Sequence, residues 1–589
     1  MSKFVSDWWT RWPKLFEREI AAFRRFSVDP QVVYQAAGLL VLEVQWPIEG
    51  KDDGYRLRIG FSPMHPFFPP EVSTDVGAFS RHQNPFSGAL CLLTQETGQW
   101  QSEQLVADFI SERLYQLIEV SEARDQANWH LAGLLEENAP DPKVPYFNDQ
   151  SEDGSVILFD GATELPKSDY GYLNLRVAKR SDGVAGAPPV EIVVESIVGE
   201  NGHPVLSSLR MPRAQQSRGM VGRWVKVQMD GVANADELLK LAEDQFSQLE
   251  VMRSKPVNRL KQKVNKDFLV TGLVFQDEIA YGDKSIGAGW LFVLQRADST
   301  GRLGKPILIM PQRAGEGDIF ARLPVASALR SRKVALIGCG AVGSFVASEL
   351  ARAGVKEITL VDCDTVETGN SLRWVLGRKA WGRKKVAALG EFLQEQYPAT
   401  RIKMIYGKFG ATTSNFEKHR PGAGGMLQQF LELFSSSDLV VDASASVEVQ
   451  QAAAYYCAEV DVPYLMGYAT LGVCGGVVAR FTCDLPCLKC LYDAWNAEAV
   501  PLPQVDEAET ILPVGCNAPV FTGSSFDLQE ISMEMSRTAV GMLSGGAYDP
   551  GAWQLAILSM KGNNGGRIAP VWSVHSVAKQ AECDCCNLK

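Results

Sequence analysis

Apolar positions change their spacing from one region of the chain to the next. In residues 1–23 they recur at helical spacing, which predicts an opening amphipathic helix, and residues 102–137 predict further helices. The runs at 32–46 and 55–61 indicate a meander of strands. Residues 1–150 therefore have the pattern of an α+β domain.

The middle of the chain, residues 151–325, has a less regular pattern. A segment rich in turn formers and acids, Asn138–Asp153, separates it from the first domain. One helical run at 236–252 accompanies three strand-like runs, at 190–198, 268–275 and 289–294. We expect a mixed α+β domain. The basic stretch at 210–226 is interpreted as solvated surface or a flexible loop.

Strands and helices alternate through residues 326–589, which predicts an α/β domain with a parallel sheet. An apolar strand precedes Gly338, Gly340 and Gly343, which have the spacing G-x-G-x-x-G, and a helix follows. Glycines in this turn let backbone N–H groups and the helix N-terminus approach a phosphate. The next strand ends at Asp362, where a carboxylate can accept hydrogen bonds from ribose hydroxyls.

Composition limits the class of protein. The 589 residues carry a net charge of −11, so nucleic acid is not expected as the principal partner. No apolar run approaches the roughly 20 residues that span a bilayer, and the N-terminus lacks a signal-peptide core. We therefore expect a cytoplasmic protein without a membrane segment. In that compartment, 12 cysteines favour metal ligation or thiol chemistry over disulfides.

Polar residues after the second strand distinguish two kinds of nucleotide enzyme. Asp364, Asn370, Arg373 and Lys385 are predicted to follow Asp362 at one edge of the sheet. A nicotinamide-dependent oxidoreductase, the first alternative, needs no such cluster. An enzyme that splits ATP between the α- and β-phosphates needs cations for the growing phosphate charge, and Arg373 and Lys385 suit that role.

This set of residues resembles the adenylation domain of ubiquitin-activating enzymes and their bacterial ThiF/MoeB relatives. The resemblance implies that Asp362 holds the ATP ribose, and that Asn370, Arg373 and Lys385 contact the ATP phosphates. The family also has a magnesium-binding Asp in a D-x-x-D pair. Here Asp442 is followed by Ala445 at the second position, so we expect Asp442 to hold Mg²⁺.

Two C-x-x-C pairs predict a structural zinc site. The first pair is Cys487 and Cys490, and the second, near the C-terminus, is Cys583 and Cys586. Four thiolates satisfy tetrahedral Zn²⁺ and leave no open position for catalysis. Cys585 lies between the last two ligands and could replace either, while a reduced cysteine-rich tail is the alternative.

Two further cysteines are candidate nucleophiles. Cys516 lies in a loop before a helix predicted from about residue 525, at the position where activating enzymes carry a catalytic cysteine. Cys91 lies in HQNPFSGALCLL, after HPFFPPEV and before Trp100. These segments resemble the ubiquitin-conjugating fold, in which Asn84 would stabilise the oxyanion. His65 stands for the usual Tyr, and Gln83 for the usual Pro. The alternatives are a buried cysteine at 516 and an ordinary strand at 91.

Together the two resemblances match the fusion proteins of bacterial CBASS anti-phage operons, in which a conjugating domain precedes an activating domain. The resemblance implies an ATP-dependent ligase that adenylates the C-terminus of a cGAS/DncV-like nucleotidyltransferase, passes it from Cys516 to Cys91 and transfers it to an amine. It also implies a homodimer and a linker domain at 151–325. The alternative is a sulfur-carrier activator of the thiamin or molybdopterin type, which would not need Cys91.

Overall fold

The computed structural model divides the chain into two compact units, Met1–Ile319 and Phe320–Lys589. The residues that the structure describes are 7–79, 82–93, 100–122, 144–148, 153–179, 189–209, 217–229, 234–245, 267–278, 286–410, 426–506, 510–511, 520–521, 523–562, 564–581, 583 and 586. Among these residues, no helix is both long and apolar enough to cross a membrane.

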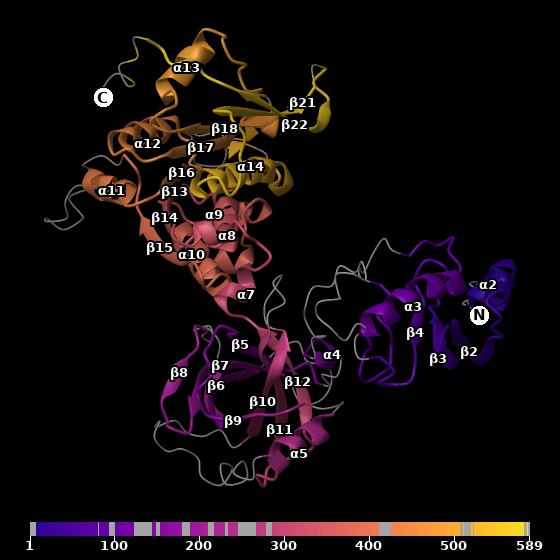
Figure 1. Ribbon diagram of the computed structural model, residues 1–589. Coiled ribbons are helices and arrows are strands. Elements are labelled where there is room, and N and C mark those ends of the chain that lie inside the picture. Colours follow the sequence, from indigo (N-terminus) through magenta and orange to yellow (C-terminus); the bar gives the residue numbers. More distant parts are fainter. Residues whose placement is uncertain are drawn as a thin grey trace. The chain divides into compact units, whose positions relative to one another are not determined.

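The N-terminal lobe, defined here as residues 7–122, is an antiparallel sheet with helices (Figure 1). Its elements are α1 (Trp8–Arg11), α2 (Pro13–Arg25), β1 (Gln31–Ala36), β2 (Leu39–Ile48), β3 (Lys51–Phe61), β4 (Glu71–Ser73) and α3 (Val106–Glu122). The four strands pair in the order β1-β2-β3-β4. Alternate residues of β2 are buried, from Leu40 to Trp46, and share one core with Phe23 of α2 and Phe109 of α3. The α+β expectation for this lobe agrees with these elements.

A hairpin replaces the single run predicted at 32–46. Ala37 and Gly38 both have positive φ, 51° and 81°, which is the backbone that a tight two-residue turn between antiparallel strands requires. The sequence signal was weak because alanine rarely adopts this conformation. Asp7 strengthens the turn, since its carboxylate accepts the Gly38 N–H at 2.9 Å.

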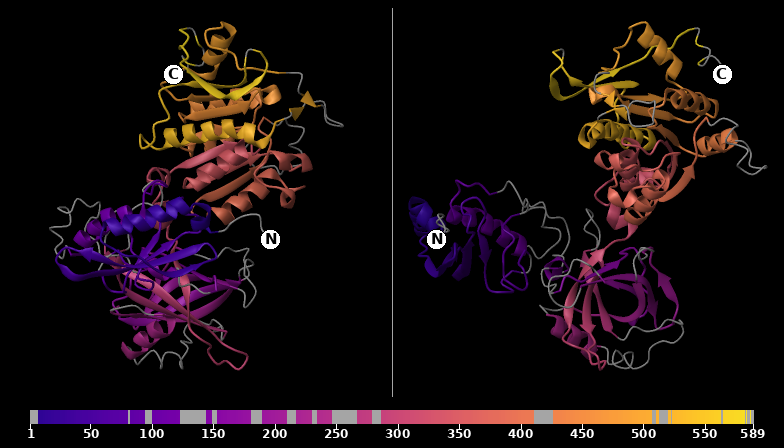
Figure 2. Two further views of the ribbon diagram at one scale, coloured as in Figure 1. Left: turned by 90° about the vertical axis from the view of Figure 1, so that its right-hand side faces the viewer. Right: turned by 180° about the vertical axis from the view of Figure 1, so that it is seen from behind.

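A closed β-barrel forms the middle of the chain, where the sequence pattern predicted a mixed α+β domain. Its elements are α4 (Val144–Asn148), β5 (Val156–Phe159), β6 (Tyr170–Lys179), β7 (Val190–Gly199), β8 (Pro204–Leu206), β9 (Ser217–Lys226), α5 (Ala235–Gln245), β10 (Phe268–Glu278), β11 (Ile286–Arg296), β12 (Ile307–Arg313) and α7 (Glu316–Phe320). The order is β5-β12-β11-β10-β9-β6-β7, and pairing of β5 with β7 closes the ring, visible in the right view of Figure 2. The strands therefore form the framework of this domain, and its helices are additions. The predicted mixed α+β architecture was wrong.

Strand β9 corrects the interpretation of the basic stretch at 210–226. Met220, Trp224 and Val225 are buried, so this part of the stretch belongs to the barrel wall. Arg223 is only 3% exposed, and its Nε donates to the Thr271 hydroxyl at 2.8 Å. Hydrogen bonding therefore lets a cation lie inside the fold. Residues 210–216 lie outside the described residues.

The C-terminal unit is the predicted α/β domain. Its helices are α8 (Ala326–Leu329), α9 (Gly343–Arg352), α10 (Lys385–Gln396), α11 (Met426–Ser435), α12 (Val447–Glu459), α13 (Leu488–Asn496) and α14 (Ser525–Leu543), with 3-10 turns η2 (Thr368–Leu372), η3 (Arg378–Ala380) and η5 (Leu471–Val473). Its strands are β13 (Lys333–Ile337), β14 (Glu357–Asp362), β15 (Arg401–Tyr406), β16 (Leu439–Asp442), β17 (Tyr464–Ala469), β18 (Gly475–Phe481), β19 (Thr510–Ile511), β20 (Val520–Phe521), β21 (Leu555–Lys561) and β22 (Arg567–His575).

The main sheet of this unit runs β15-β14-β13-β16-β17-β18-β21-β22. The first five strands are parallel, and the last three continue the sheet in antiparallel pairing. One core lies under α9, α10 and α14, and a second lies under α11, α12 and α13 (Figure 1). The strand order reverses around β13, which is where parallel sheets of this kind bind ligands.

Candidate nucleotide and cysteine sites

The glycine loop joins β13 to α9 at the carboxyl edge of the sheet. Gly338 has φ +86°, and a Cβ there would lie 2.7 Å from the Ser444 backbone nitrogen. A Cβ on Gly343 would lie 1.9 Å from the Gly338 carbonyl oxygen. A Cβ on Gly340, by contrast, would have no atom of the described residues within 4 Å. Two glycines therefore close the turn, while the third keeps its outer side open, as a phosphate requires.

Asp362 is fixed against this loop by both of its carboxylate oxygens. One oxygen accepts the Cys339 N–H at 2.7 Å, and the other accepts the Asp364 N–H at 2.7 Å. These bonds tie the end of β14 to the glycine loop before any nucleotide binds. Cys339 itself is buried, and burial raises the pKa of its thiol well above the usual value. Cys339 is thus a packing residue rather than a nucleophile.

Lys385 begins α10 and faces the same segment. Its Nζ lies 2.8 Å from the Asp364 carboxylate, and its side chain is 13% exposed while that of Asp364 is 60% exposed. Backbone pairing strengthens the contact, since the Lys385 N–H donates to the Asp364 carbonyl at 3.0 Å. The structure therefore brings together the predicted Asp362, Asp364 and Lys385 at one strand end.

Asn370 lies on the 3-10 turn η2, and Arg373 follows that turn directly, between Asp364 and α10. The Asn370 side-chain oxygen accepts the Glu367 N–H at 3.0 Å, which directs its amide NH₂ group away from that turn. Arg373 ends the turn, and its N–H donates to the Asn370 carbonyl at 2.9 Å. Both predicted residues are thus held on a short, hydrogen-bonded segment.

Trp374 is a residue of this site that the sequence reasoning missed. Its indole N–H donates to the Cys339 carbonyl at 2.7 Å, and the side chain is 5% exposed. This bond fastens the segment carrying Arg373 directly to the glycine loop. The site was predicted from the spacing of polar residues, and a tryptophan next to Arg373 is not part of that spacing.

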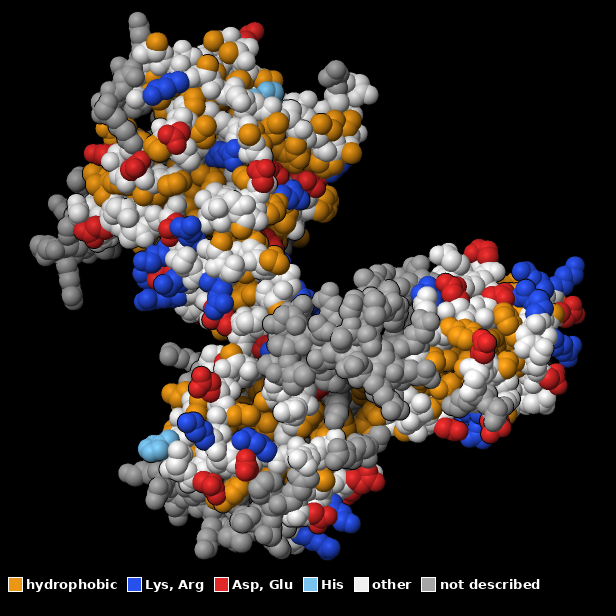
Figure 3. Space-filling view, viewed as in Figure 1, with side chains coloured by type: hydrophobic (Ala, Val, Ile, Leu, Met, Phe, Trp, Pro, Cys, Tyr) orange, Lys and Arg blue, Asp and Glu red, His pale blue; other side chains and the backbone are white. Residues whose placement is uncertain are grey.

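Further exposed cations lie on the segment between η2 and α10, outside the predicted site. Figure 3 shows Lys and Arg side chains gathered at the end of the C-terminal unit where α10 and β15 lie. Exposed cations between η2 and α10 include Arg378, Lys379 and Lys384. These three cations lie on the segment that joins Arg373 to Lys385, where positive charge favours the approach of polyphosphate.

Asp442 ends β16 and is fully buried. One of its oxygens accepts the Ser444 N–H at 2.8 Å, and the other accepts the Tyr464 hydroxyl at 2.9 Å. Burial raises the pKa of the Asp442 carboxyl despite these bonds. Each oxygen of Asp442 therefore accepts one hydrogen bond inside the protein, from Ser444 and from Tyr464. The assignment of Mg²⁺ to Asp442 stays a prediction.

The four predicted zinc cysteines converge at α13. Their sulfur atoms lie within 4.8 Å of one another, and three pairs are 3.9, 3.5 and 3.7 Å apart: Cys487–Cys490, Cys487–Cys583 and Cys490–Cys586. Tetrahedral zinc with Zn–S bonds of about 2.3 Å implies sulfur separations of roughly 3.8 Å. The Gln580 N–H points at the Cys490 sulfur at 3.5 Å, a supporting contact typical of metal thiolates. The geometry fits zinc, while Cys585 lies outside the described residues.

The Cys91 loop carries the residues that depart from the conjugating-enzyme motif. Cys91 is exposed, and its N–H donates to the His82 carbonyl at 2.8 Å. Gln83 is 6% exposed and makes four bonds to the backbone. Its oxygen accepts from Gly77 and Phe79, and its NH₂ group donates to Asp75 and Gly88.

Asn84 follows on the same loop. Its side-chain oxygen accepts the N–H groups of Phe86 at 2.8 Å and Ser87 at 3.1 Å. These bonds fix the amide orientation and turn the NH₂ end, the only donor end, away from the local backbone. The side chain is thus set as a donor on the loop that leads to Cys91.

His65 is fully buried. Its Nε2 lies 3.1 Å from the Glu19 carboxylate, whose other oxygen accepts the Val106 N–H at 2.9 Å. The pair links α2, the loop before β4 and the start of α3. Trp100 holds the same loop, because its indole N–H donates to the Pro66 carbonyl at 2.7 Å. Cys516, the other candidate nucleophile, lies outside the described residues.

Comparison with known proteins agrees with this geometry. Residues 316–563 match the ThiF family. The chain is 40% identical over 581 residues to the uncharacterized protein y4oA of Sinorhizobium fredii (strain NBRC 101917 / NGR234), covering 98% of this chain and 97% of that protein. It is 27% identical over 224 residues to the ATP-dependent ubiquitin transferase-like protein Cap2 of Enterobacter hormaechei subsp. hoffmannii (strain UCI 50), covering 38% of this chain and 34% of Cap2.

Among solved structures, the crystal structure of E. coli MccB with ATP matches 45% of this chain and 68% of its own, with a TM-score of 0.32 and 15% identity. The near-full-length match to y4oA and the ThiF match carry the assignment. The chain belongs to the same family as y4oA, and its C-terminal half is a ThiF-family, ATP-dependent adenylation domain.

Proposed function

We propose that this protein activates the C-terminal carboxylate of a partner protein with ATP and transfers it, through thioesters, to an amine. The acyl donor would be the C-terminus of a cGAS/DncV-like nucleotidyltransferase, and the setting anti-phage defence. The observation that supports the adenylation step is that, at the end of β14, Asp362 accepts from the glycine loop while Lys385 pairs with Asp364.

Adenylation needs the carboxylate to attack the α-phosphate while pyrophosphate departs. The N–H groups of the glycine loop and the cations Arg373 and Lys385 would bind the phosphates and stabilise the growing charge. Asp362 would hold the ribose. Lys385 is already placed by Asp364, so little ordering is required when ATP binds. Mg²⁺, when bound, would neutralise phosphate charge; Asp364 is the exposed carboxylate of the cluster.

The transfer steps use the two cysteines. Cys516 would attack the acyl adenylate, forming a thioester and releasing AMP, and Cys91 would take the acyl group by thiol exchange. An amine, lysine in our proposal, would then attack that thioester. The exposure of Cys91 and the fixed amide of Asn84 support this role. The partial similarity to Cap2, an ATP-dependent ubiquitin transferase-like protein, supports conjugation in general.

Ordered trapping of the cysteines tests the proposal. Cys516→Ala is expected to retain ATP–pyrophosphate exchange with the partner protein but to load neither cysteine. Cys91→Ala should leave a reducible thioester on Cys516. If amide products still form without Cys91, the N-terminal lobe is not a carrier. If the activated carboxylate instead becomes a thiocarboxylate, the chain is a sulfur-carrier activator.

A further inference from the structure

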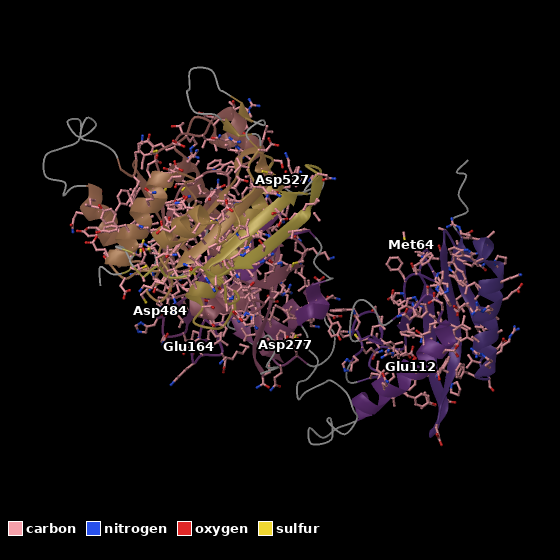
Figure 4. All side chains as sticks on the ribbon, turned by 90° about the horizontal axis from the view of Figure 1, so that it is seen from above. Met64, Glu112, Glu164, Asp277, Asp484 and Asp527 are labelled. Carbon is pink, nitrogen blue, oxygen red and sulfur yellow. The ribbon has the colours of Figure 1, made fainter. Side chains whose placement is uncertain are left out.

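The short helix α4 joins the barrel to the Cys91 loop. On the barrel side, Phe147 is 4% exposed and packs in one cluster with Leu273 of β10 and Leu291 of β11. The Val144 N–H donates to the Asp277 carboxylate of β10 at 3.0 Å. Asp277, labelled in Figure 4, is 2% exposed. The helix is therefore fastened to the barrel by an apolar anchor and a buried hydrogen bond.

The barrel is shaped to accept this anchor. Gly289 lies on β11 beside Asp277, and a Cβ there would lie 2.4 Å from the Asp277 Cβ. A larger residue would push the carboxylate that holds α4. The position of α4 thus depends on the packing of two neighbouring barrel strands.

Two side chains of α4, Tyr146 and Phe147, also contact the Cys91 loop. Phe147 meets Phe86 edge-on, with ring centroids 4.9 Å apart. The Tyr146 hydroxyl lies 3.9 Å from the Cys91 sulfur. Phe86 is also the residue whose N–H fixes the Asn84 side chain. One helix of the barrel therefore contacts Cys91 directly, and it also contacts Phe86, the residue whose N–H is bound by the Asn84 side chain.

We infer that Tyr146 is a further residue of the transfer site, donating its hydroxyl hydrogen to the Cys91 sulfur when that sulfur carries negative charge. The inference rests on the proposed function for its chemistry, because Cys91 must act as a nucleophile and a leaving group. It gives the barrel a part in the reaction, where the sequence implied only a linker.

The bond changes fit a donor at this position. When an amine attacks the Cys91 thioester, its nitrogen bonds to the carbonyl carbon, the C–S bond breaks, and the electron pair stays on the sulfur. The proton lost by the attacking nitrogen goes to solvent. Tyr146 keeps its own proton and hydrogen-bonds to the thiolate, which lowers the energy of the departing group.

Site-resolved alkylation tests the contact without any partner protein. The full chain is treated with iodoacetamide across a pH series, and the Cys91 peptide is quantified by mass spectrometry. Beside Cys91 the described groups that titrate are His82 of its own loop and Tyr146, with Asp277 behind α4. Tyr146→Phe should raise the midpoint of Cys91 alkylation by about half to one pH unit, since one unit equals ~1.4 kcal/mol between the two charge states.

Tyr34→Phe is the matched control, because Tyr34 is an exposed tyrosine on β1 of the same lobe. It should leave the midpoint unchanged. An unchanged midpoint in Tyr146→Phe would overturn the inference.

A second measurement separates this inference from the proposed function. With Cys91 loaded, Tyr146→Phe should slow discharge to an amine roughly three- to tenfold. A shifted midpoint with no loading of Cys91 would support the contact and refute the proposed transfer. Normal loading with an unshifted midpoint and normal discharge would refute the contact alone.

Discussion

The glycine-loop site and the Cys91 loop reach a fixed geometry in different ways. In the C-terminal unit, the motif residues hold one another: Asp362 accepts from the loop, and Lys385 pairs with Asp364. In the N-terminal lobe, the motif is altered, and other side chains do the holding. In the conjugating-enzyme motif that this segment resembles, a proline and a tyrosine stand at these positions; here Gln83 makes four backbone bonds and His65 pairs with Glu19.

The consequence of a departure from a motif depends on the position that is changed. A substitution at a position that touches the reactants removes chemistry, whereas one at a supporting position can be replaced by a different set of hydrogen bonds. Gln83 and His65 are 6% and 0% exposed, so they belong to the supporting kind. Their roles are structural, and the exposed Cys91 is unaltered.

The largest expected effect is loss of a cation from the glycine-loop site. Lys385→Ala should lower ATP–pyrophosphate exchange by about 10²–10³-fold, because charge growing on the phosphates loses a preorganised partner. Lys403→Ala is the control, since Lys403 pairs with Glu357 on the sheet at 2.7 Å. Normal exchange in a folded Lys385→Ala protein would refute the role of Lys385.

Loss of a zinc ligand tests whether bound metal stabilises the C-terminal unit. One zinc per chain is expected by elemental analysis, and Cys487→Ser should lower the melting temperature of this unit by roughly 5–10 °C. Cys483→Ser is the matched control, because Cys483 is exposed and outside the four-sulfur cluster. A zinc-free preparation of equal stability would count against the site.

Loss of the buried Glu19–His65 contact should have a smaller effect, on the stability of the N-terminal lobe. Glu19→Ala removes the carboxylate that is hydrogen-bonded to His65 and to the Val106 N–H, and should destabilise the lobe by about 3 kcal/mol because buried polar groups lose their partner. Pyrophosphate exchange should be unchanged, since the glycine loop lies in the other unit. Chemical denaturation followed by tryptophan fluorescence measures the first expectation, and loss of exchange would show that the sites are not independently held.

The smallest effect concerns Trp374. Trp374→Phe keeps the ring but removes the bond to the Cys339 carbonyl, which is worth about 1 kcal/mol. The KM for ATP should rise about fivefold. Trp381→Phe, an exposed tryptophan on the same segment, should have less effect. Equal KM values for ATP in both variants would show that the Trp374 hydrogen bond does not support the ATP site.

Polar site residues could be predicted from the sequence better than the packing of apolar residues could. Asp362, Lys385 and the four cysteines were predicted because their chemistry depends on residue type and spacing. The barrel was not predicted, because the pairings that close it, β5 with β12 and β6 with β9, join segments far apart in the chain and leave no periodic signal. The Tyr146 contact with Cys91 was invisible for the same reason, since it depends on how α4 packs on β10. Trp374 gave no signal because tryptophans are common in cores.

The most direct test of the account is the fate of Cys91→Ser. With ATP and the partner protein, the serine hydroxyl should accept the acyl group as an ester, which is attacked by amines more slowly than a thioester because an alkoxide is the poorer leaving group. Mass spectrometry should then find the partner's C-terminus on residue 91, bound in a form that resists reducing agent and requires Lys385. Partner C-terminus found only on Cys516, with amide products still forming, would contradict the relay.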